Sequence, residues 1–325
     1  MVREVVIGID GGGSQTRVMV SDFTGHILSY TEGGASSIHK DRNAHINVQQ
    51  AIKKALAEAG CHGDQVKGLY AGIAGYESEL DLPWVSRLTK VDGLYCPVTY
   101  VNDSVVAHAG AFLGEPGIVI VSGTGSIILA ITEQEKQYRN IDFHHYAASA
   151  ARFISYNATY ELLAGNMDLS DASMVEHILL YWNVKSVVEL RSLAAKGFIE
   201  EEKERNKLFG QMAPMITSSA QEGSQLARIV CDRALHEIMV GVEILGAFFE
   251  SDSVKVTGIG SVINSLYMKS KLTEKLQLGR NKRYLFAPSE LSAVSGAVLM
   301  ALRGLDIQVD SITIENMKKH PRSIW

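Results

Sequence analysis

A run of glycines and hydroxyls at residues 10–16, placed between two strand-like segments, constrains this chain more than any other feature. Residues 5–9 and 17–22 are apolar enough to be strands, and a turn at Thr24 leads to a third apolar run at residues 26–28. Glycine lets backbone N–H groups approach an anion without a Cβ in the way. The pattern predicts a phosphate-binding hairpin, although a single glycine run would also fit an ordinary turn.

Each residue type in this hairpin suits one part of a nucleotide. Asp10 can hold Mg²⁺ through its water shell, because Mg²⁺ keeps several waters in proteins. A P-loop is excluded, because the sequence lacks Gly-x-x-x-x-Gly-Lys-Ser/Thr. A Rossmann site is disfavoured, because Thr16 replaces the third glycine and the turn runs into a strand. The expected phosphate-binding residues are Gly11, Gly12, Gly13, Ser14 and Thr16.

Size and charge limit the classes of function. The 325 residues can bury a full core and predict two domains. A net charge of −5 gives no basic surface for nucleic acid. Cys61, Cys96 and Cys231 form neither a disulfide framework nor a metal-ligand spacing. Because no apolar run approaches the ~20 residues of a membrane span and no signal-peptide pattern opens the sequence, we expect a cytoplasmic protein without a membrane partner.

Strand and helix patterns alternate along the first half, which is typical of α/β architecture. The helices expected there are residues 43–59, 77–89 and 104–112, and the strands are residues 67–74 and 98–101. A strand, a glycine–hydroxyl turn and a strand then recur at residues 117–131. This repeat predicts a structural duplication: two similar domains that face each other, each with a phosphate-binding hairpin.

The second half is mostly helical between residues 147 and 250. A strand at residues 254–257 ends in Gly258 and Gly260, where we expect the next helix to begin. A late strand at 283–286 and a small-residue helix at 289–302 follow, and the last twenty residues look peripheral. The predicted domains are residues 1–113 with about 289–325, and residues 114–288 with a helical insert.

The order and spacing of four segments resemble the N-acetylglucosamine kinase and benzoyl-CoA reductase ATPase family, which belongs to the actin, heat-shock chaperone and hexokinase superfamily. The resemblance runs from Ile7 to about Ala301 and includes the stretch 288–301 and the helical insert near Ala227 and Ala234. Each motif alone is weak, but together they are fairly specific. The four segments are Asp10 with its glycines, Asn102-Asp103, residues 122–126, and residues 258–261.

The resemblance implies two actin-like (ribonuclease H-like) domains with an ATP cleft between them, the sugar on the N-terminal side and the nucleotide on the C-terminal side. Asp10 would lie near Mg²⁺, and Asp103 would be the general base that takes the proton of a sugar hydroxyl. The second phosphate loop would be Gly123, Thr124, Gly125 and Ser126. The adenosine pocket would be Gly258, Gly260, Ser261 and Asn264.

Asp103 has a second interpretation from the residues themselves. Aspartate before a helix is a favoured N-cap, and residues 104–112 are the expected helix. Capping and catalysis can coexist, so both interpretations stay open.

The sugar pocket departs from the family pattern. Relatives that phosphorylate N-acetylglucosamine carry Gly-Gly-Trp-Gly and Gly-Asp-Glu-Gly-type segments, but here Phe143-His144 and residues 148–151 stand at those places, without the carboxylates. The acetamido-sugar specificity is therefore not carried over, and a muramic-acid derivative is one alternative acceptor. The candidate acceptor contacts are Ser36, Ser37, Asn102, Asp103, His144 and His145.

His144 and His145 also fit a polar surface segment, and His39, Lys40 and Arg42 predict a solvated loop.

The preferred hypothesis is an ATP- and Mg²⁺-dependent kinase of a sugar, whose domains close over the cleft to exclude water, and which forms a homodimer. One alternative is an ATPase that drives a partner enzyme, disfavoured because the three cysteines are not grouped for an iron–sulfur cluster. The other is a nucleotide- or sugar-binding sensor, suggested by the lost carboxylates and opposed by Asp10 and Asp103.

Overall fold

The computed structural model describes residues 3–324, and these divide into two compact units. Unit 1 is Met1–Val119 with Pro288–Trp325, and unit 2 is Ile120–Ala287. The boundary lies inside a strand, Gly117–Ser122, a few residues beyond the boundary expected from the glycine-rich turn at residue 114. None of the helices in residues 3–324 combines the length and apolar character needed to cross a bilayer.

Unit 1 contains a mixed five-stranded sheet in the order β3-β2-β1-β4-β5. β1 pairs with β2 and β2 with β3 in antiparallel fashion, whereas β4 and β5 are parallel to β1. The strands are β1 (Val5–Gly11), β2 (Thr16–Asp22), β3 (Ile27–Gly33), β4 (Val66–Ile73) and β5 (Val98–Val101). The helices are α1 (Ala44–Ala59), α2 (Leu82–Leu88), α3 (Asp103–Phe112), α10 (Ala293–Arg303) and α11 (Ser311–Lys318).

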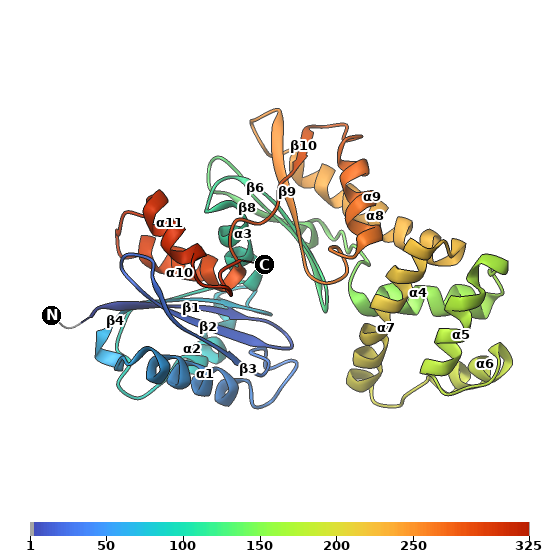
Figure 1. Ribbon diagram of the computed structural model, residues 1–325, viewed down its shortest axis with the longest axis horizontal. Helices are drawn as coiled ribbons and strands as arrows, with labels where there is room; N and C mark the ends of the chain where they lie inside the picture. The colour runs from blue at the N-terminus through green and yellow to red at the C-terminus, as the bar shows by residue number, and fades with distance from the viewer. Residues whose placement is uncertain (1–2, 325) are drawn as a thin grey trace. The chain divides into compact units, whose positions relative to one another are not determined.

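Alternation along β1 gives this sheet two buried faces. Ile7 and Ile9 pack with α1 and α2, while Val6 packs with α10 and α11. Helices cover both faces, with α1 and α2 on one and α10 and α11 on the other (Figure 1). α10 approaches so closely that a Cβ on Gly8 would lie 2.5 Å from the backbone nitrogen of Val298. Burial of both faces fixes the strand ends that carry the candidate site.

Unit 2 has a second five-stranded sheet, in the order β10-β9-β6-β7-β8. Its strands are β6 (Gly117–Ser122), β7 (Ser126–Ile131), β8 (Gln137–Arg139), β9 (Ser253–Ile259) and β10 (Arg283–Phe286). Its helices are α4 (Ala151–Ala164), α5 (Ala172–Tyr181), α6 (Val187–Ala195), α7 (Glu202–Glu222), α8 (Gln225–Gly246) and α9 (Leu266–Leu276). Residues 3–324 also contain four short 3₁₀ turns: Gly63–Gln65 and Glu79–Asp81 in unit 1, and Asn140–Phe143 and Leu169–Asp171 in unit 2.

Four expectations about local structure were wrong in detail. The helix expected over residues 77–89 is a 3₁₀ turn followed by α2, because Asp81 accepts hydrogen bonds from the backbone of the residues before it. The helix expected at Ser261 begins at Leu266. The helix expected over residues 289–302 begins at Ala293, where Ser292 caps it. The supposedly peripheral end contains α11, whose Met317 is fully buried.

Candidate active site

Asp10 lies near the end of β1 and faces Arg17 across the hairpin. Arg17 Nη1 is 2.8 Å from Asp10 Oδ2, and only 7% of Asp10 is exposed. Burial raises the pKa of Asp10 above its ordinary value, and the charge and hydrogen bond of Arg17 oppose that rise. The ion pair therefore fixes the orientation of a buried carboxylate. Mg²⁺ is usually held by one or two carboxylates with waters and substrate phosphates, so Asp10 beside a phosphate-type turn fits this ion.

Gly11, the first glycine after Asp10, is required by its neighbours. A Cβ on Gly11 would lie 2.7 Å from Ser36 Oγ and 2.8 Å from Ile73 Cδ1, so a larger residue would displace the adjacent loop. The turn is closed by a 2.9 Å hydrogen bond from the backbone N–H of Gly12 to the carbonyl oxygen of Gln15. Ser14 at the tip is exposed, so its hydroxyl can reach a ligand.

Thr16 and Ser36, both predicted to contact ligands, hold backbone together. The buried Thr16 donates through Oγ1 to the carbonyl oxygen of Gly34 at 2.7 Å. Ser36 donates to the carbonyl oxygen of Gly12 from both Oγ and its backbone N–H, each at 3.2 Å. These bonds attach the loop at residues 34–36 to the phosphate hairpin. The ligand roles of the two residues stay predictions.

Parallel strands bring the remaining unit 1 candidates to one edge of the sheet. β1, β4 and β5 all end there, and the backbone N–H of Ala74 donates to the carbonyl oxygen of Gly11 at 2.7 Å. A Cβ on Gly75 would lie 3.3 Å from Ser37 Oγ. The carboxyl ends of parallel strands are the usual ligand-binding edge of α/β sheets. Ser37 and the two aspartates Asp10 and Asp103 therefore belong to one edge.

Asn102, rather than Asp103, is the N-cap of α3. The side-chain oxygen of Asn102 accepts from the backbone N–H of Ser104 at 3.1 Å and from its hydroxyl at 2.6 Å. Its amide nitrogen donates to the carbonyl oxygen of Tyr76 at 3.1 Å and to Glu77 Oε1 at 3.3 Å. The interpretation of Asp103 as the cap is therefore wrong, and its carboxylate is not needed to cap the helix. Asn102 itself makes structural bonds, and its acceptor contact stays a prediction.

The electrostatic surroundings of Asp103 suit a proton acceptor. Burial, followed by the negative charges of Asp10 and Glu77, raises its pKa to about 7, while the backbone N–H of Ser104 opposes the rise. A general base works best when its pKa lies near the operating pH. Asp103 is thus tuned to exchange a proton near neutrality.

In unit 2, the second glycine turn is held by bonds to the segment that precedes α4. Ser122 Oγ donates to the carbonyl oxygen of Ser149 at 2.6 Å, and Ser126 Oγ donates to that of Ala147 at 3.0 Å. The backbone N–H of Ala151 donates to the carbonyl oxygen of Gly123 at 2.7 Å. The segment that lacks the family's carboxylates therefore supports this turn. Thr124 and Gly125 are exposed at its tip.

The predicted adenosine loop lies against the same turn. The carbonyl oxygen of Ser122 accepts from the backbone N–H groups of Val262 and Ile263 at 3.1 and 3.3 Å. Gly260 has a φ of +109°, and a Cβ there would collide with that same carbonyl oxygen. These bonds explain why residues 261–264 form a turn and not the start of a helix.

Asn264 fixes the shape of this loop. Its side-chain nitrogen donates to the carbonyl oxygens of Gly258 and Gly260 at 3.0 and 3.1 Å. Ser261 is exposed beside the turn. Unit 2 therefore brings together the two motifs predicted to bind phosphate and adenosine, which lie more than one hundred residues apart in the chain.

The two histidines differ from each other. His144 is exposed and has a φ of +54° at the end of a 3₁₀ turn. The ring of His145 packs against α8, where a Cβ on Gly241 would lie 3.3 Å from His145 Nδ1, and Nε2 is 3.6 Å from Glu237 Oε2. Of the two, His144 has the side chain open to a ligand. The acceptor contacts assigned to both stay predictions.

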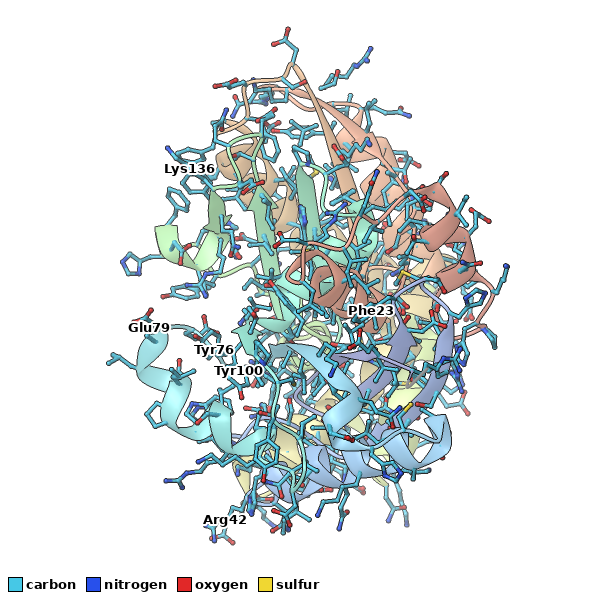
Figure 2. All side chains as sticks on the ribbon, turned by 90° about the vertical axis from the view of Figure 1, so that its left-hand side faces the viewer. Phe23, Arg42, Tyr76, Glu79, Tyr100 and Lys136 are labelled. Atoms are coloured by element: carbon cyan, nitrogen blue, oxygen red, sulfur yellow. The ribbon has the colours of Figure 1, made fainter. Side chains whose placement is uncertain are left out.

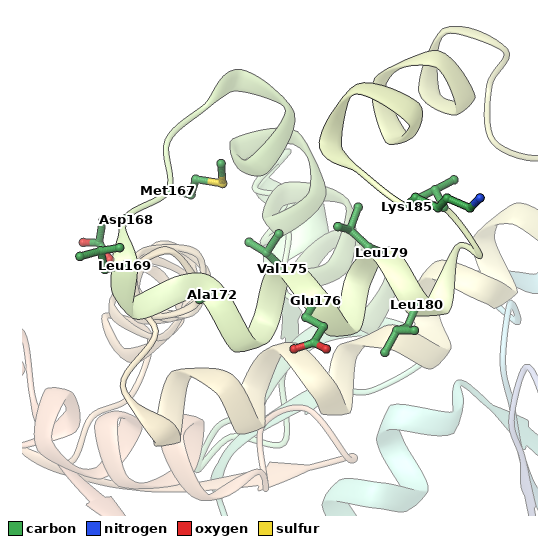
Figure 3. A pocket seen from close by; sticks show the side chains of 10 residues that line it. Met167, Asp168, Leu169, Ala172, Val175, Glu176, Leu179, Leu180 and Lys185 are labelled. Carbon is green, nitrogen blue, oxygen red and sulfur yellow. The ribbon is translucent and has the colours of Figure 1, made fainter.

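Two further observations bear on ligands. Within residues 3–324, no three His, Cys, Asp or Glu side chains are grouped as a metal site. A hollow of about 950 Å³ lies along α5 in unit 2, but it is lined mainly by apolar side chains (Figure 3). Its lining includes none of the residues predicted to bind ATP or sugar.

Three site features were not predicted from the sequence. The partner of Asp10, Arg17, could have been found from the hairpin register, because residues at opposite positions of two antiparallel strands face each other. The capping role of Asn102 was hidden by the aspartate next to it. The third feature is the nearness of the Glu77 carboxylate to Asp103. It depends on how β4 and β5 pair, which no local pattern in the sequence reveals.

The sequence model of the BadF/BadG/BcrA/BcrD ATPase family matches residues 7–301. The chain belongs to this family. The match spans the aspartate, glycine and hydroxyl motifs of both units, and the expected resemblance is confirmed. ATP use follows from membership of an ATPase family.

Individual relatives agree with this assignment. The chain is 24% identical over 304 residues to the N-acetylmuramic acid/N-acetylglucosamine kinase of Clostridium acetobutylicum, covering 91% of this chain and 97% of that protein. A candidate N-acetylglucosamine kinase from Chromobacterium violaceum has a similar structure, with a TM-score of 0.70, 18% identity, and coverage of 93% and 99%. A glucokinase of the ROK family from Streptomyces griseus, solved with glucose and AMPPNP, has a TM-score of 0.55, 17% identity, and coverage of 91% and 98%. The expected fold class, α/β with actin-like domains, is confirmed.

Proposed function

We propose that this family member is an ATP-dependent kinase that phosphorylates a hydroxyl of an amino sugar or sugar derivative. The observation that carries the proposal is Asp103, which lies at the start of α3 just after the parallel strand β5, is not the helix cap, and has a pKa of about 7. The curated relative named above acts on N-acetylmuramic acid and N-acetylglucosamine according to its name, and its similarity covers most of both chains.

The residues of unit 1 divide the chemistry between them. Asp103 accepts the proton of the attacking hydroxyl. Such a base typically raises the reaction rate by about 10²–10⁴-fold. Asp10, held by Arg17, would hold Mg²⁺, and the backbone N–H groups of the glycine hairpin would donate to phosphate. Bound ATP with Mg²⁺ supplies the phosphoryl group and neutralises the charge that develops during transfer.

In unit 2, the chain contributes backbone donors and hydroxyls. The turn of Gly123 to Ser126 binds phosphate, and the loop from Gly258 to Asn264 binds adenosine. Support for this division comes from Gly260, whose lack of a side chain lets the two segments pack together. The sugar side and nucleotide side expected from the resemblance are part of this proposal.

The partner-driving ATPase is the weaker alternative. An iron–sulfur cluster at a subunit interface needs exposed thiolates, but Cys61 and Cys231 are buried and burial raises the pKa of both thiols. Cys96 is only partly exposed. The three thiols thus offer poor ligands for such a cluster.

A coupled assay of ADP release over a panel of amino sugars, hexoses and muramic acid derivatives tests the proposal. We expect turnover to require an acceptor. ADP release that is independent of any sugar would favour the ATPase, and tight ATP binding without turnover would favour a sensor.

Asp103→Asn tests the assignment of the base in the same assay. The variant should lose at least ~10²-fold in sugar-dependent turnover and keep its ATP affinity, because the amide cannot accept the proton but fills the same space. Unchanged turnover would remove Asp103 from the mechanism. Ser104→Ala, a neighbouring change outside the proposed proton path, is the control for local disturbance.

The proposal extends to the state of the protein in the cell. We propose a cytoplasmic homodimer, because most soluble oligomers are symmetric and dimers are the commonest. Light scattering coupled to gel filtration would measure the mass, and a value of one chain, 35.4 kDa, would refute the dimer.

A further inference from the structure

The phosphate hairpin of unit 1 needs a positive charge that Arg17 does not supply. A nucleoside triphosphate carries several negative charges, and the hairpin already contains the carboxylate of Asp10. Arg17 already donates through Nη1 to Asp10 Oδ2 at 2.8 Å and through Nη2 to Gln15 Oε1 at 3.1 Å. A cation in addition to the Mg²⁺ proposed at Asp10 would therefore stabilise a phosphate bound at the turn.

A neighbouring loop is fixed against the hairpin by backbone bonds. Ser36 donates twice to the carbonyl oxygen of Gly12, at 3.2 Å each. The carbonyl oxygen of Ser37 then accepts from the backbone N–H groups of Lys40 and Asp41, at 2.9 and 3.0 Å. This tight turn sets the direction of the Lys40 side chain relative to the hairpin.

The aliphatic part of Lys40 lies across Gly13. A Cβ on Gly13 would be 3.6 Å from Lys40 Cγ and 3.9 Å from Lys40 Cε, which is ordinary van der Waals contact. Nζ is one bond beyond Cε and lies more than 4 Å from that Cβ position, so the ammonium group extends past Gly13. The glycine leaves open the space between the turn and the lysine.

The ammonium group of Lys40 is also accessible to an anionic ligand. Its side chain is exposed, and it makes no ion pair with any of the residues 3–324 that the structure describes. By contrast, Lys54 pairs with Glu58 and Lys271 pairs with Glu274. An exposed lysine that packs beside a phosphate-type turn and makes no ion pair with the described residues is suited to an anionic ligand.

We propose that Lys40 binds the terminal phosphate of the nucleoside triphosphate at the unit 1 hairpin, an assignment that rests on the proposed kinase function. The sequence alone predicted a solvated loop around Lys40. It could not reveal the contact with Gly13, because that contact depends on how two distant turns pack. Lysine binds phosphate as a point charge. Phosphoryl transfer is catalysed mostly by positioning and electrostatic stabilisation, so such a charge acts on both binding and turnover.

The test compares nucleotide binding without sugar in Lys40→Met, Lys40→Arg and the matched control Arg42→Met. Arg42 is on the same loop but lies at the outer edge of unit 1, away from the labelled Tyr76 and Tyr100 (Figure 2). Calorimetry would use AMP-PNP with Mg²⁺ and ADP with Mg²⁺. We expect Lys40→Met to weaken AMP-PNP binding by ~10-fold or more, to change ADP binding by less than about threefold, and Lys40→Arg to recover part of the loss. Arg42→Met should match the native protein for both nucleotides.

Each other result overturns the assignment. Equal losses for AMP-PNP and ADP, with an unchanged thermal midpoint, would show that Lys40 does not distinguish the terminal phosphate. A rise in the KM for the sugar with an unchanged KM for ATP would place Lys40 at the acceptor. Native affinity in Lys40→Met would refute the contact while leaving the kinase proposal intact. If the native protein binds neither nucleotide, the proposed function fails and Lys40 fails with it.

Discussion

In unit 1 the glycine turn follows a carboxylate and ends beside an arginine, whereas in unit 2 the turn from Ser122 to Ser126 contains hydroxyls and no charged side chain. The first is fixed by an ion pair and by the packing of Ser36 on Gly11. The second is fixed by hydrogen bonds to backbone carbonyls and by the close approach of Gly260. Similar turns in the two units are therefore stabilised by different forces.

The difference separates two chemical tasks. A charged turn can orient a metal ion and lies on the same sheet edge as the proposed base, but it must offset the cost of a buried carboxylate. An uncharged turn can bind phosphate through backbone and hydroxyl groups at little electrostatic cost. We therefore expect substitutions at the unit 1 turn to change stability in a way that depends on pH. Substitutions at the unit 2 turn should change stability according to the backbone geometry that they disturb.

The largest effect is expected for Gly260→Ala in unit 2. Alanine would have to adopt a φ of +109° and would collide with the carbonyl oxygen of Ser122, so we expect a loss of about 3 kcal/mol or more in the free energy of unfolding. Urea unfolding would measure it. Gly125→Ala is the matched control, because nothing lies within 4 Å of a Cβ there, and its stability should change by less than about 0.5 kcal/mol. Equal effects of the two would contradict the geometry.

A smaller effect is expected for Arg17→Met in unit 1. It would leave the buried Asp10 without its cation and should cost about 1–3 kcal/mol at pH 8. Because Asp10 would then bind a proton more readily, the loss should shrink toward acid pH. Thermal unfolding between pH 5 and 8 would show it. Ser126→Ala, which removes one neutral hydrogen bond in unit 2, should cost about 1 kcal/mol at every pH. A pH-independent loss in Arg17→Met would argue that the pair contributes through packing alone.

Third in size is the cap of α3. Asn102→Ala should cost about 1 kcal/mol, because it removes the acceptor for the N–H of Ser104, whereas Asn102→Asp should keep most of the stability. Denaturant titration at pH 8 would compare these with Asp103→Ala. A greater loss of stability in Asp103→Ala than in Asn102→Ala would reverse the capping assignment.

The comparison also separates what the sequence predicts from what it does not. Glycine, hydroxyl and aspartate motifs at strand ends are local, so the two turns, Asp103 and the loop at Gly258 could all be found from their spacing. Residues that contact the site from another helix, strand or loop could not be found so readily. The contact of Lys40 with Gly13 and the nearness of Glu77 to Asp103 depend on tertiary packing. The end of the chain was misjudged for the same reason, since Met317 is buried only because α11 packs on the sheet.

The last effect to test is a pH dependence centred on Asp103. Its pKa in the folded protein is about 7, compared with an ordinary value of 3.8, because burial and the charges of Asp10 and Glu77 favour the protonated form. The folded state therefore holds a proton that the unfolded state has lost, and stability should fall as pH rises from about 4 to about 7. Asp103→Asn removes this contribution, so its stability relative to the native protein should increase over that interval.

Activity should show the opposite dependence on pH. A base must be deprotonated to act, so the kcat/KM of the native enzyme should rise through pH 7 and reach about half of its plateau there. The same burial that destabilises the ionised carboxylate thus keeps it basic enough to accept a proton. Because the uncharged turn of unit 2 has no such group, Ser126→Ala should leave the midpoint of this profile unchanged. A profile that is flat from pH 5 to 8 would mean that proton transfer to Asp103 does not limit turnover.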